Sequence, residues 1–394
     1  MSRLAELIEK LCPDGVEYKQ LSECVVLPTI PSGLKRNQYE TFGSYPIVDQ
    51  GRGKIAGFTC DETKLVRDVP GIVFGDHTRE IKYVDYVFAP GADGVKWIRA
   101  VDGVSVRYLF HCLTSLSIPS RGYNRHWILV REMLIPVPPL EVQQEIVRIL
   151  DQFATLEAEL EVELEARRTQ YEHYRNHLLS YESLAARGPV EMAKIGDLGS
   201  FVRGGGLQKA DFVEQGKPCI HYGQIHTVFG VSTDSVISMV SKEQFPRLKH
   251  ASSGDLLIAT TSEDDEAVAK ATAWLGNESV AISGDMFLYR HSLDPRYVSH
   301  YFASQHFQER KRPFLTGVKV RRISEKGLKE ITIPVPVREE QRRIADLLDR
   351  FDALVNDITS GLPAEIAARR AQYEHYRDRL LSFPEKAASG DDAP

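Results

Sequence analysis

Two short segments carry a glutamate and a lysine in the spacing Glu-x-Lys, at Glu62–Lys64 and at Glu80–Lys82. With an upstream aspartate, such as Asp49 or Asp76, these side chains could hold a divalent ion and activate water to cut a phosphodiester. Charged residues make up 26% of the sequence, so this spacing often arises by chance. Neither segment has a counterpart at the matching place further along the chain, and a stand-alone metal-dependent nuclease is the weaker interpretation.

A second candidate metal pair is His173 and His177, one turn apart in a segment expected to be helical. A nearly identical later segment keeps the first histidine, as His375, but has Arg379 in place of the second. Solvated or partner-facing residues are therefore favoured. The sequence also lacks a Gly-x-x-x-x-Gly-Lys-Ser/Thr nucleotide motif and an Asn-Pro-Pro-Tyr-like motif for amino methylation. We predict no catalytic residue, no metal site and no cofactor site in this chain.

Polar, basic and aromatic residues gather instead in the glycine-containing loops of two regions. Glycine lets the backbone approach a phosphate, and Arg, Gln, Asn and His can hydrogen-bond to base edges in a major groove. Candidate DNA contacts in the first region are Arg52, Lys54, His77, Thr78, Arg79, Tyr123, Asn124, Arg125 and His126. Those in the second region are Arg203, Gln208, Lys209, His221, Tyr222, Gln224, Thr261, Ser262, Lys319, Arg321 and Arg322. Both regions end in a glycine loop followed by basic residues, which favours Arg125, Lys319 and Arg321.

The average charge argues against a nucleic-acid partner, but the distribution of charge does not. The 394 residues carry a net charge of −6, whereas DNA favours a basic surface. Acid and base are segregated: every odd position from Glu157 to Glu165 is glutamate, and the stretch from Arg310 to Lys329 is strongly basic. Local fields therefore matter more than the total charge.

Cysteine usage and hydropathy favour a cytoplasmic protein. The five cysteines are scattered and never spaced as Cys-x-x-Cys, which disfavours a disulfide framework or a zinc site. No apolar run is long enough to cross a bilayer. The opening residues, Met1–Leu11, look amphipathic rather than like a signal peptide. We expect a cytoplasmic location and no membrane contact.

The strongest pattern is an internal repeat. Residues 166–181 read ARRTQYEHYRNHLLSY, and residues 368–383 read ARRAQYEHYRDRLLSF. Upstream, residues 135–153 read IPVPPLEVQQEIVRILDQF, and residues 333–351 read IPVPVREEQRRIADLLDRF. A fainter match joins residues 16–24 to residues 190–198. The chain is therefore a duplicated two-part unit, in which a variable region is followed by a repeated one.

The repeated regions are predicted to be long helices. Apolar residues recur at alternating spacings of three and four, as in a coiled-coil seam. The seam residues are Ile146, Ile149, Phe153, Leu156 and Leu160 in the first copy, and Ile344, Leu347, Phe351, Leu354 and Ile358 in the second. The stretch Leu156–Ala166 alternates with period two, but its composition favours a helix. Gly361 and Pro363 are expected to break the helix of the second copy.

These patterns predict an α+β protein in which two variable domains of mixed α/β fold alternate with two helical regions. The variable domains combine short strands with one helix each, expected at Val106–Leu113 and at Pro295–Lys311. The expected divisions are a leader helix at 1–14, variable domains at 15–138 and 186–336, helical regions at 139–185 and 337–383, and a disordered tail at 384–394. The two helical regions are expected to pack as an antiparallel coiled coil with pseudo-twofold duplication.

The doubled pattern of Ile-Pro-Val-Pro, a heptad helix and Tyr-Glu-His-Tyr-Arg resembles the specificity subunit of type I restriction-modification systems. The resemblance covers essentially the whole chain, and it includes the stretch Gly361–Ile366 that this family often shows. The second copy departs from the pattern at Val337-Arg338, where the first has Pro139-Leu140.

The resemblance implies two target recognition domains, each reading one half of a bipartite double-stranded DNA sequence, with the helices as spacer. It also implies that two methyltransferase subunits dock on this chain and that restriction subunits join through them. S-adenosylmethionine, ATP and Mg would be bound by those partners. Candidate docking residues are Gln143, Gln144, Tyr171, Tyr174, Arg175, Gln341, Tyr373, Tyr376 and Arg377. A coiled-coil adaptor that binds no DNA remains the alternative.

Overall fold

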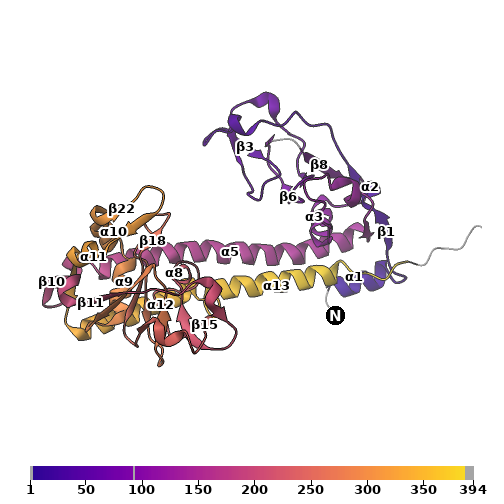
Figure 1. Cartoon of the computed structure of the whole chain (residues 1–394). Helices are drawn as coiled ribbons and strands as arrows, with labels where there is room; N and C mark the ends of the chain where they lie inside the picture. The colour runs from indigo at the N-terminus through magenta and orange to yellow at the C-terminus, as the bar shows by residue number, and fades with distance from the viewer. Residues whose placement is uncertain (1–2, 92–93, 387–394) are drawn as a thin grey trace, which may run out of the picture. The chain divides into compact units, whose positions relative to one another are not determined.

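The computed structural model describes residues 3–91 and 94–386, and its chain divides into two compact units. The first unit comprises Met1–Glu159 and Ile366–Pro394, and the second comprises Leu160–Glu365. The border falls inside the helices α5 (Leu140–Leu178) and α13 (Leu362–Leu380), so the units cut across the helical regions expected from the sequence (Figure 1). Among the described residues, no helix is both long and apolar enough to span a membrane.

The first unit is layered around the sheet β2-β8-β5-β6. Successive strand residues point to opposite faces. In β5, Ile72 and Phe74 pack towards the helices α3 and α5, whereas Val73 packs against residues of the sheet β4-β3-β7. Its strands are β1 (Glu17–Gln20), β2 (Val25–Val26), β3 (Tyr45–Val48), β4 (Gly57–Thr59), β5 (Gly71–Gly75), β6 (Ile81–Val84), β7 (Ala89–Pro90), β8 (Val95–Ala100) and β9 (Leu134–Val137). Its shorter helices are α1 (Arg3–Leu11), α2 (Leu21–Cys24), α3 (Val106–Ser115) and α4 (Trp127–Val130).

The second unit has the same layering around the sheet β11-β21-β17-β19-β14. In β17, Leu256 and Ile258 face the helices α9 and α12, while Leu257 faces the sheet β12-β15-β13-β20-β16. Its strands up to β17 are β10 (Val190–Lys194), β11 (Gly199–Arg203), β12 (Phe212–Val213), β13 (Lys217–Ile220), β14 (Ser232–Thr233), β15 (Ser238–Val240), β16 (Lys249–Ala251) and β17 (Leu256–Ala259). The later strands are β18 (Thr261–Ser262), β19 (Ala271–Trp274), β20 (Val280–Ile282), β21 (Met286–His291), β22 (Leu315–Thr316), β23 (Arg321–Ile323) and β24 (Thr332–Pro336).

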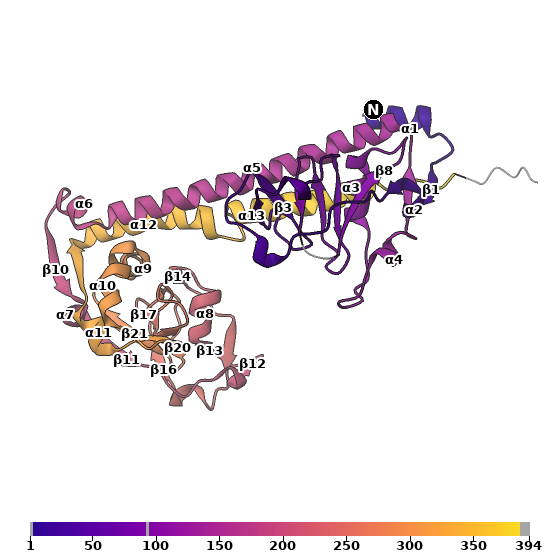
Figure 2. The ribbon, with the colours of Figure 1, turned by 90° about the horizontal axis from the view of Figure 1, so that it is seen from above.

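The helices of the second unit support this sheet, and α9 lies beside α12 (Figure 2). They are α6 (Tyr181–Ala185), α7 (Ile195–Leu198), α8 (Tyr222–Thr227), α9 (Pro295–Ala303), α10 (Gln305–Lys311), α11 (Glu325–Glu330) and α12 (Arg338–Asn356). The helix expected over Pro295–Lys311 is divided at Ser304, whose side chain caps α10 by accepting from the Phe307 amide. The helix expected at Val106–Leu113 is confirmed as α3.

The Ile-Pro-Val-Pro segments play the same part in both units. In the first, β9 pairs with β1 in antiparallel register, and Val137 lies opposite Glu17. In the second, β24 pairs with β10, and Val335 lies opposite Glu191. The faint match between residues 16–24 and 190–198 therefore marks the strand that receives each repeat.

The long helices follow the sequence prediction in most respects. The glutamate-rich stretch is helical within α5, and the second copy breaks between Asn356 and Leu362. A Cβ atom at Gly361 would lie 2.4 Å from the Ala353 carbonyl oxygen, so this turn requires glycine. The seam is buried at its start but not at its end, and Ile358 is 79% exposed because it lies beyond the last residue of α12.

Within each unit, two helical segments run antiparallel. In the first unit, Phe153 of α5 stacks on Tyr376 of α13, and Glu157 pairs with Arg370. In the second unit, Tyr174 of α5 stacks on Phe351 of α12, one turn from the contact between Tyr171 and Asp352.

A partly buried polar network ties the helices of the first unit together. The Asp151 carboxylate accepts from Arg107 at 2.8 Å and lies 3.1 Å from His111 Nε2. His111 Nδ1 lies 3.1 Å from the Tyr373 hydroxyl. An ionised carboxylate can only accept, so the imidazole proton sits on Nε2 and the tyrosine donates to Nδ1. We call Arg107, His111, Asp151 and Tyr373 the first network.

The second unit repeats this arrangement with equivalent residues. Asp349 accepts from Arg296 at 2.7 Å and lies 2.7 Å from His300 Nε2. The Tyr171 hydroxyl lies 3.4 Å from His300 Nδ1 and also donates to Asp352 at 3.1 Å. We call Arg296, His300, Asp349 and Tyr171 the second network. In both networks the tyrosine comes from the Tyr-Glu-His-Tyr-Arg segment of the other copy.

One buried glutamine fastens the start of each repeated helix to its domain, Gln143 in the first unit and Gln341 in the second. Gln143 Oε1 accepts from the Ser105 amide at 2.8 Å, and its Nε2 donates to the carbonyl oxygens of Gly103 and Pro138. In the second unit, Gln341 accepts from the Asp294 amide and donates to the Pro336 carbonyl. Ser105 and Asp294 are the N-caps of α3 and α9, so each glutamine connects a domain helix to a repeated helix.

The tail expected to be disordered, 384–394, is ordered at its first three residues. Lys386 donates its amide to the Val16 carbonyl, and Val16 donates to Pro384. Residues 387–394 lie outside the described residues.

Replacing Gln143 by alanine should destabilise the first unit by about 2 to 3 kcal/mol, because this fully buried side chain would be lost and three backbone groups, including the buried Pro138 carbonyl, would lose a partner. The neighbouring Gln144 is exposed and serves as a matched control, for which we expect a change within about 0.5 kcal/mol. Denaturant unfolding followed by tryptophan fluorescence measures both. Equal stability of the two variants would contradict this account of the glutamine.

His111 should make the first unit sensitive to mild acid. Burial, reinforced by Arg107, lowers the pKa of His111 from 6.5 to about 4. Between these values the unfolded state binds more protons than the folded state, so stability falls as the pH drops from 6.5 towards 4. We expect a loss of about 2 kcal/mol between pH 7 and pH 5.

Hydrogen exchange in the amides of α3, corrected for intrinsic rates, tests this at both pH values. His111→Gln removes the titrating group and should abolish the pH-dependent loss of protection. The same loss in the variant would assign it to another group.

Candidate nucleic-acid interface

Three loops of the first unit meet around a stacked aromatic pair. The rings of His77 and Tyr123 are 4.6 Å apart and nearly parallel. The His77 amide donates to Gln50 Oε1, and the Thr78 hydroxyl donates to the Gln50 carbonyl oxygen at 2.6 Å. Tyr123 remains 81% exposed. The loops at 49–54, 76–80 and 120–126, here the first loop cluster, thus present His77, Thr78 and Tyr123 together.

Other predicted contacts of the first unit hold these loops in place. His126 is fully buried, with Nδ1 beside the Asp76 carbonyl oxygen and Nε2 accepting from the Arg121 amide. Arg79 donates to the Ile118 carbonyl at 2.9 Å from a left-handed backbone conformation, with φ of 67°. His126 and Arg79 therefore support the cluster. Arg52, Lys54, Asn124 and Arg125 are exposed on it.

Lys82 of the Glu-x-Lys segment is an internal anchor. Its amino group donates to the carbonyl oxygens of Asp49 and Gly53 and lies 3.8 Å from the Asp49 carboxylate. Burial lowers the pKa of this lysine. These bonds fix the base of the loop at 49–54. Among the described residues, no group of three or more His, Cys, Asp or Glu side chains is placed to hold a metal ion.

The second unit gathers its candidates along two adjoining hollows that share Arg203 and Asp285. One hollow is lined by the glycine loop 204–206, Gln208, His221 and Tyr222. The other is lined by Thr260, Thr261, Thr316 and Arg322. We call this surface the second loop face. It brings together residues from five segments that lie far apart in the sequence.

Some residues of the second loop face are also structural. His221 Nδ1 accepts from the Gly223 amide and caps α8, and burial next to Lys209 lowers its pKa. Gln224 is buried, accepting from the His221 amide at 2.8 Å and donating to Ser238 at 2.6 Å. Lys209 is exposed at the rim, whereas Gln224 is an internal support.

A small sheet, β18-β23-β22, carries the basic residues at one end of the second loop face. Thr261 lies opposite Arg322, and Ser262 lies opposite Arg321. Arg321 forms an ion pair with Asp265, whereas the Arg322 guanidinium has no hydrogen-bond or ion-pair partner among the described residues. Lys319 is exposed in the turn between β22 and β23.

The predicted docking residues separate into buried and exposed groups. Gln143, Gln341, Tyr171 and Tyr373 form the interior bonds described above, with Arg175 and Arg377 beside the two tyrosine rings at 5.1 and 5.8 Å. Tyr174 and Tyr376 each stack on a phenylalanine but keep 37% and 38% of their surface exposed. Gln144 is also exposed. Gln144 and Tyr376 are therefore accessible for docking in the first unit, and Tyr174 is accessible in the second.

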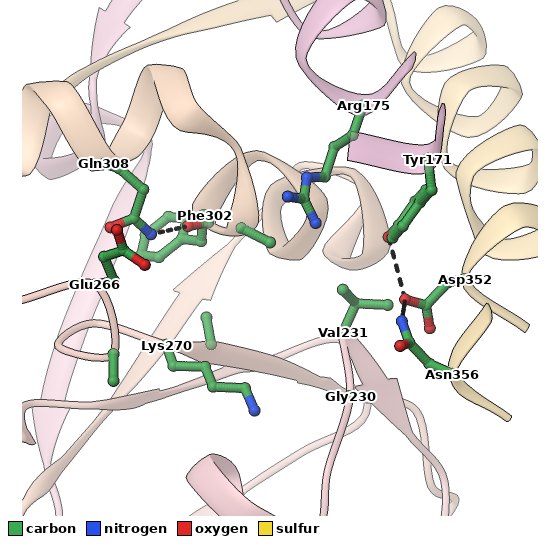
Figure 3. Close-up of a pocket in the computed structure, with 13 residues that line it drawn as sticks. Tyr171, Arg175, Gly230, Val231, Glu266, Lys270, Phe302, Gln308, Asp352 and Asn356 are labelled. Carbon is green, nitrogen blue, oxygen red and sulfur yellow. Dashed lines mark hydrogen bonds between the residues drawn. The ribbon is translucent and has the colours of Figure 1, made fainter. Parts of the chain in front are cut away.

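A cavity of about 300 Å³ lies beside the second network (Figure 3). Arg175 and Lys270 reach it from different sides, and the carboxylates of Glu266 and Asp352 complete its charged lining. Asn356 donates to Asp352 at 2.9 Å. The cavity is therefore lined by equal numbers of basic and acidic side chains, Arg175 and Lys270 against Glu266 and Asp352.

The sequence contained a signal for the networks that pattern reading missed. The first unit has Arg107-Tyr108 followed by His111, and the second has Arg296-Tyr297 followed by His300. In both, the tyrosine hydroxyl donates to the carbonyl oxygen of the first proline of Ile-Pro-Val-Pro, at 3.0 Å and 2.9 Å. The shared Arg-Tyr-x-x-His spacing lies within regions otherwise dissimilar.

Comparison with known proteins agrees with this architecture. The model of a family described as the type I restriction modification DNA specificity domain matches residues 104–166 and 188–368. A type I restriction enzyme specificity subunit of Escherichia coli is 31% identical, with 98% of each chain covered.

Solved structures share the mixed α/β fold with a long helix. The type I restriction-modification S subunit of M. genitalium covers 93% of this chain and 96% of its own, with a TM-score of 0.56 and 14% identity. A chain from work on complex assembly and conformational transition of the type I R-M system covers 94% and 98%, with a TM-score of 0.56 and 18% identity. The extent of the family match and of the E. coli relative shows that this chain belongs to the type I restriction-modification DNA specificity family.

Proposed function

We propose that this chain is the non-catalytic specificity subunit of a type I restriction-modification complex and that it reads a bipartite DNA target. The observation that carries the proposal is the recurrence of one helix-to-domain junction in two units with different loops. The first and second networks use equivalent residues. In contrast, the first loop cluster and the second loop face have few residue types in common. Identical junctions suit identical partners, and different loops suit different half-sites.

The recurrence also supports an internal duplication with pseudo-twofold symmetry. The register of β1–β9 matches that of β10–β24, and Gln143 and Gln341 make equivalent bonds. The antiparallel contacts within each unit fit a coiled coil formed by the two helical regions. In this proposal the helices hold two target recognition domains at a fixed separation.

The proposed partners supply the chemistry. Two methyltransferase subunits would dock on the repeated helices, with Gln144, Tyr174 and Tyr376 as accessible contacts. They would bind S-adenosylmethionine and modify adenines, and restriction subunits would join through them with ATP and Mg. Target bases would be flipped out of the duplex by the methyltransferase rather than by this chain.

Mapping methylated adenines tests the proposed function. The chain is expressed with its neighbouring methyltransferase in a host that lacks adenine methylation, and modified bases are located across the genome. We expect one split motif with a fixed gap, which would also identify both half-sites. A complex that assembles but leaves the genome unmodified would favour a coiled-coil adaptor that binds no DNA.

Helix length should set the gap between the half-sites. Deleting Leu160–Glu163 removes about one turn of α5, roughly 6 Å, just after the border of the two units. We expect the gap to shorten by about one to two base pairs, at roughly 3.4 Å each, with both half-sites retained. The same methylation map measures this.

Val162→Ala is the matched control, because this exposed residue lies in the same segment and its replacement keeps the helix length. The control should leave the motif unchanged. An unchanged gap in the deletion variant would show that the helices do not act as a spacer.

A further inference from the structure

An acidic loop lies against the basic hairpin of the second unit. The loop follows β18 and contains residues 263–266, while the hairpin is formed by β22 and β23. Because β18 pairs with β23, the loop begins directly beside Arg321. Neighbouring residues in a strand point to opposite sides, so Arg321 and Arg322 face different surroundings.

Every side-chain nitrogen of Arg321 donates a hydrogen bond. Its Nε and Nη2 both donate to the Asp265 carboxylate, and its Nη1 donates to the Gly317 carbonyl oxygen. The side chain of Arg321 is 26% exposed in this arrangement. A forked contact of this kind fixes orientation as well as distance. Arg321 therefore fastens the hairpin turn to the acidic loop.

Both ends of this contact are rigidly held. Gly317 has a φ of 91°, and a Cβ atom there would lie 2.1 Å from the Val320 carbonyl oxygen, so the turn is tight. On the loop side, the buried Lys311 donates to the carbonyl oxygens of Glu266 and Val268. Asp265 is thus held by an anchored loop, and not by a free one.

The remaining basic residues of the hairpin are available. Arg322 lines the hollow that also contains Arg203 and Thr261, and Lys319 is exposed in the turn. Moving Arg321 to a phosphate would break its contacts with both Asp265 and Gly317, whereas Arg322 has no such contact with any residue that the structure describes.

We infer that Asp265 and Arg321 form a positioning pair, which sets the hairpin so that Arg322 and Lys319 meet the DNA backbone. Arg321 acts through the shape of the hairpin and does not itself contact DNA. This inference rests on the proposed function, and it assigns a specificity-supporting role to an acidic residue in a basic region.

The sign of the effect at Asp265 separates this inference from its opposite. If Arg321 contacted phosphate, Asp265 would compete with DNA, and removing its charge would tighten binding. If the pair positions the hairpin, removing either member weakens binding to the cognate duplex. Asp265→Asn keeps the size of the side chain and removes the charge.

The test uses the full chain in complex with its methyltransferase and a duplex carrying both half-sites found by methylation mapping. Dissociation constants are measured over a range of salt concentrations. We expect Asp265→Asn and Arg321→Ala each to weaken binding about tenfold, and the double variant to lose no more than either single variant. Arg322→Ala should reduce the salt slope by about 1, and Asp265→Asn and Arg321→Ala should each reduce it as well, because a displaced hairpin no longer brings Arg322 and Lys319 to the phosphates.

Glu263→Gln is the matched control, because it removes an exposed carboxylate from the same loop. It should leave affinity unchanged or slightly raise it, opposite in sign to Asp265→Asn. Exchanging the charges, with Asp265→Arg and Arg321→Asp together, should restore part of the affinity lost by the single variants, because the ion pair is formed again whereas the bond to the Gly317 carbonyl is not. Restoration would also show that the losses do not come from unfolding.

Tighter binding by Asp265→Asn, or a salt slope that Asp265→Asn leaves unreduced, would overturn the inference and make Arg321 a phosphate contact. Failure of the wild-type complex to methylate or bind DNA would instead count against the proposed function. The two failures are therefore distinguishable in one set of measurements.

Discussion

The arginine–aspartate–histidine–tyrosine networks constrain the rest of this protein. Their histidines are fully buried, and a buried polar group requires hydrogen-bond partners, because leaving it unpaired inside a protein is strongly unfavourable. In each network, an arginine and a histidine of one domain helix contact the aspartate of a repeated helix. The other ring nitrogen of the histidine contacts a tyrosine hydroxyl. That tyrosine comes from the repeat segment of the other copy, so neither unit completes its interior from one copy alone. The near-identity of the repeats follows from this exchange.

The same constraint explains which parts of the chain are free to differ. Arg107 and His111 lie on one side of α3, and Arg296 and His300 occupy equivalent places on α9. These helices pack between a sheet and the repeated helices. Loops at the far edges of the sheets take no part in the networks. Variation there changes the surface without disturbing the junction.

Periodicity predicted the helices and their breaks, because the spacing of apolar residues and of glycine depends on local geometry. Periodicity did not predict which helix each tyrosine of the repeats would contact, because a heptad pattern identifies the apolar face of a helix but not the helix that packs against it. Burial of polar residues was missed for the same reason: Gln143 and His126 resemble surface residues until their backbone partners are known. The prediction of Ile358 as a seam residue was wrong because the helix ends at Asn356.

The net charge of the chain says little about the charge of any one binding surface. The net charge of −6 suggests a poor ligand for DNA, yet carboxylates such as Asp151, Asp349 and Asp265 are already paired with arginine. Two adjacent arginines show the consequence. Arg321 neutralises Asp265 and adds almost no field at a distance, whereas Arg322 keeps its full charge at the edge of a hollow. The affinity of such a face for a phosphate backbone depends on unpaired cations, and strand alternation decides which of two neighbours remains unpaired.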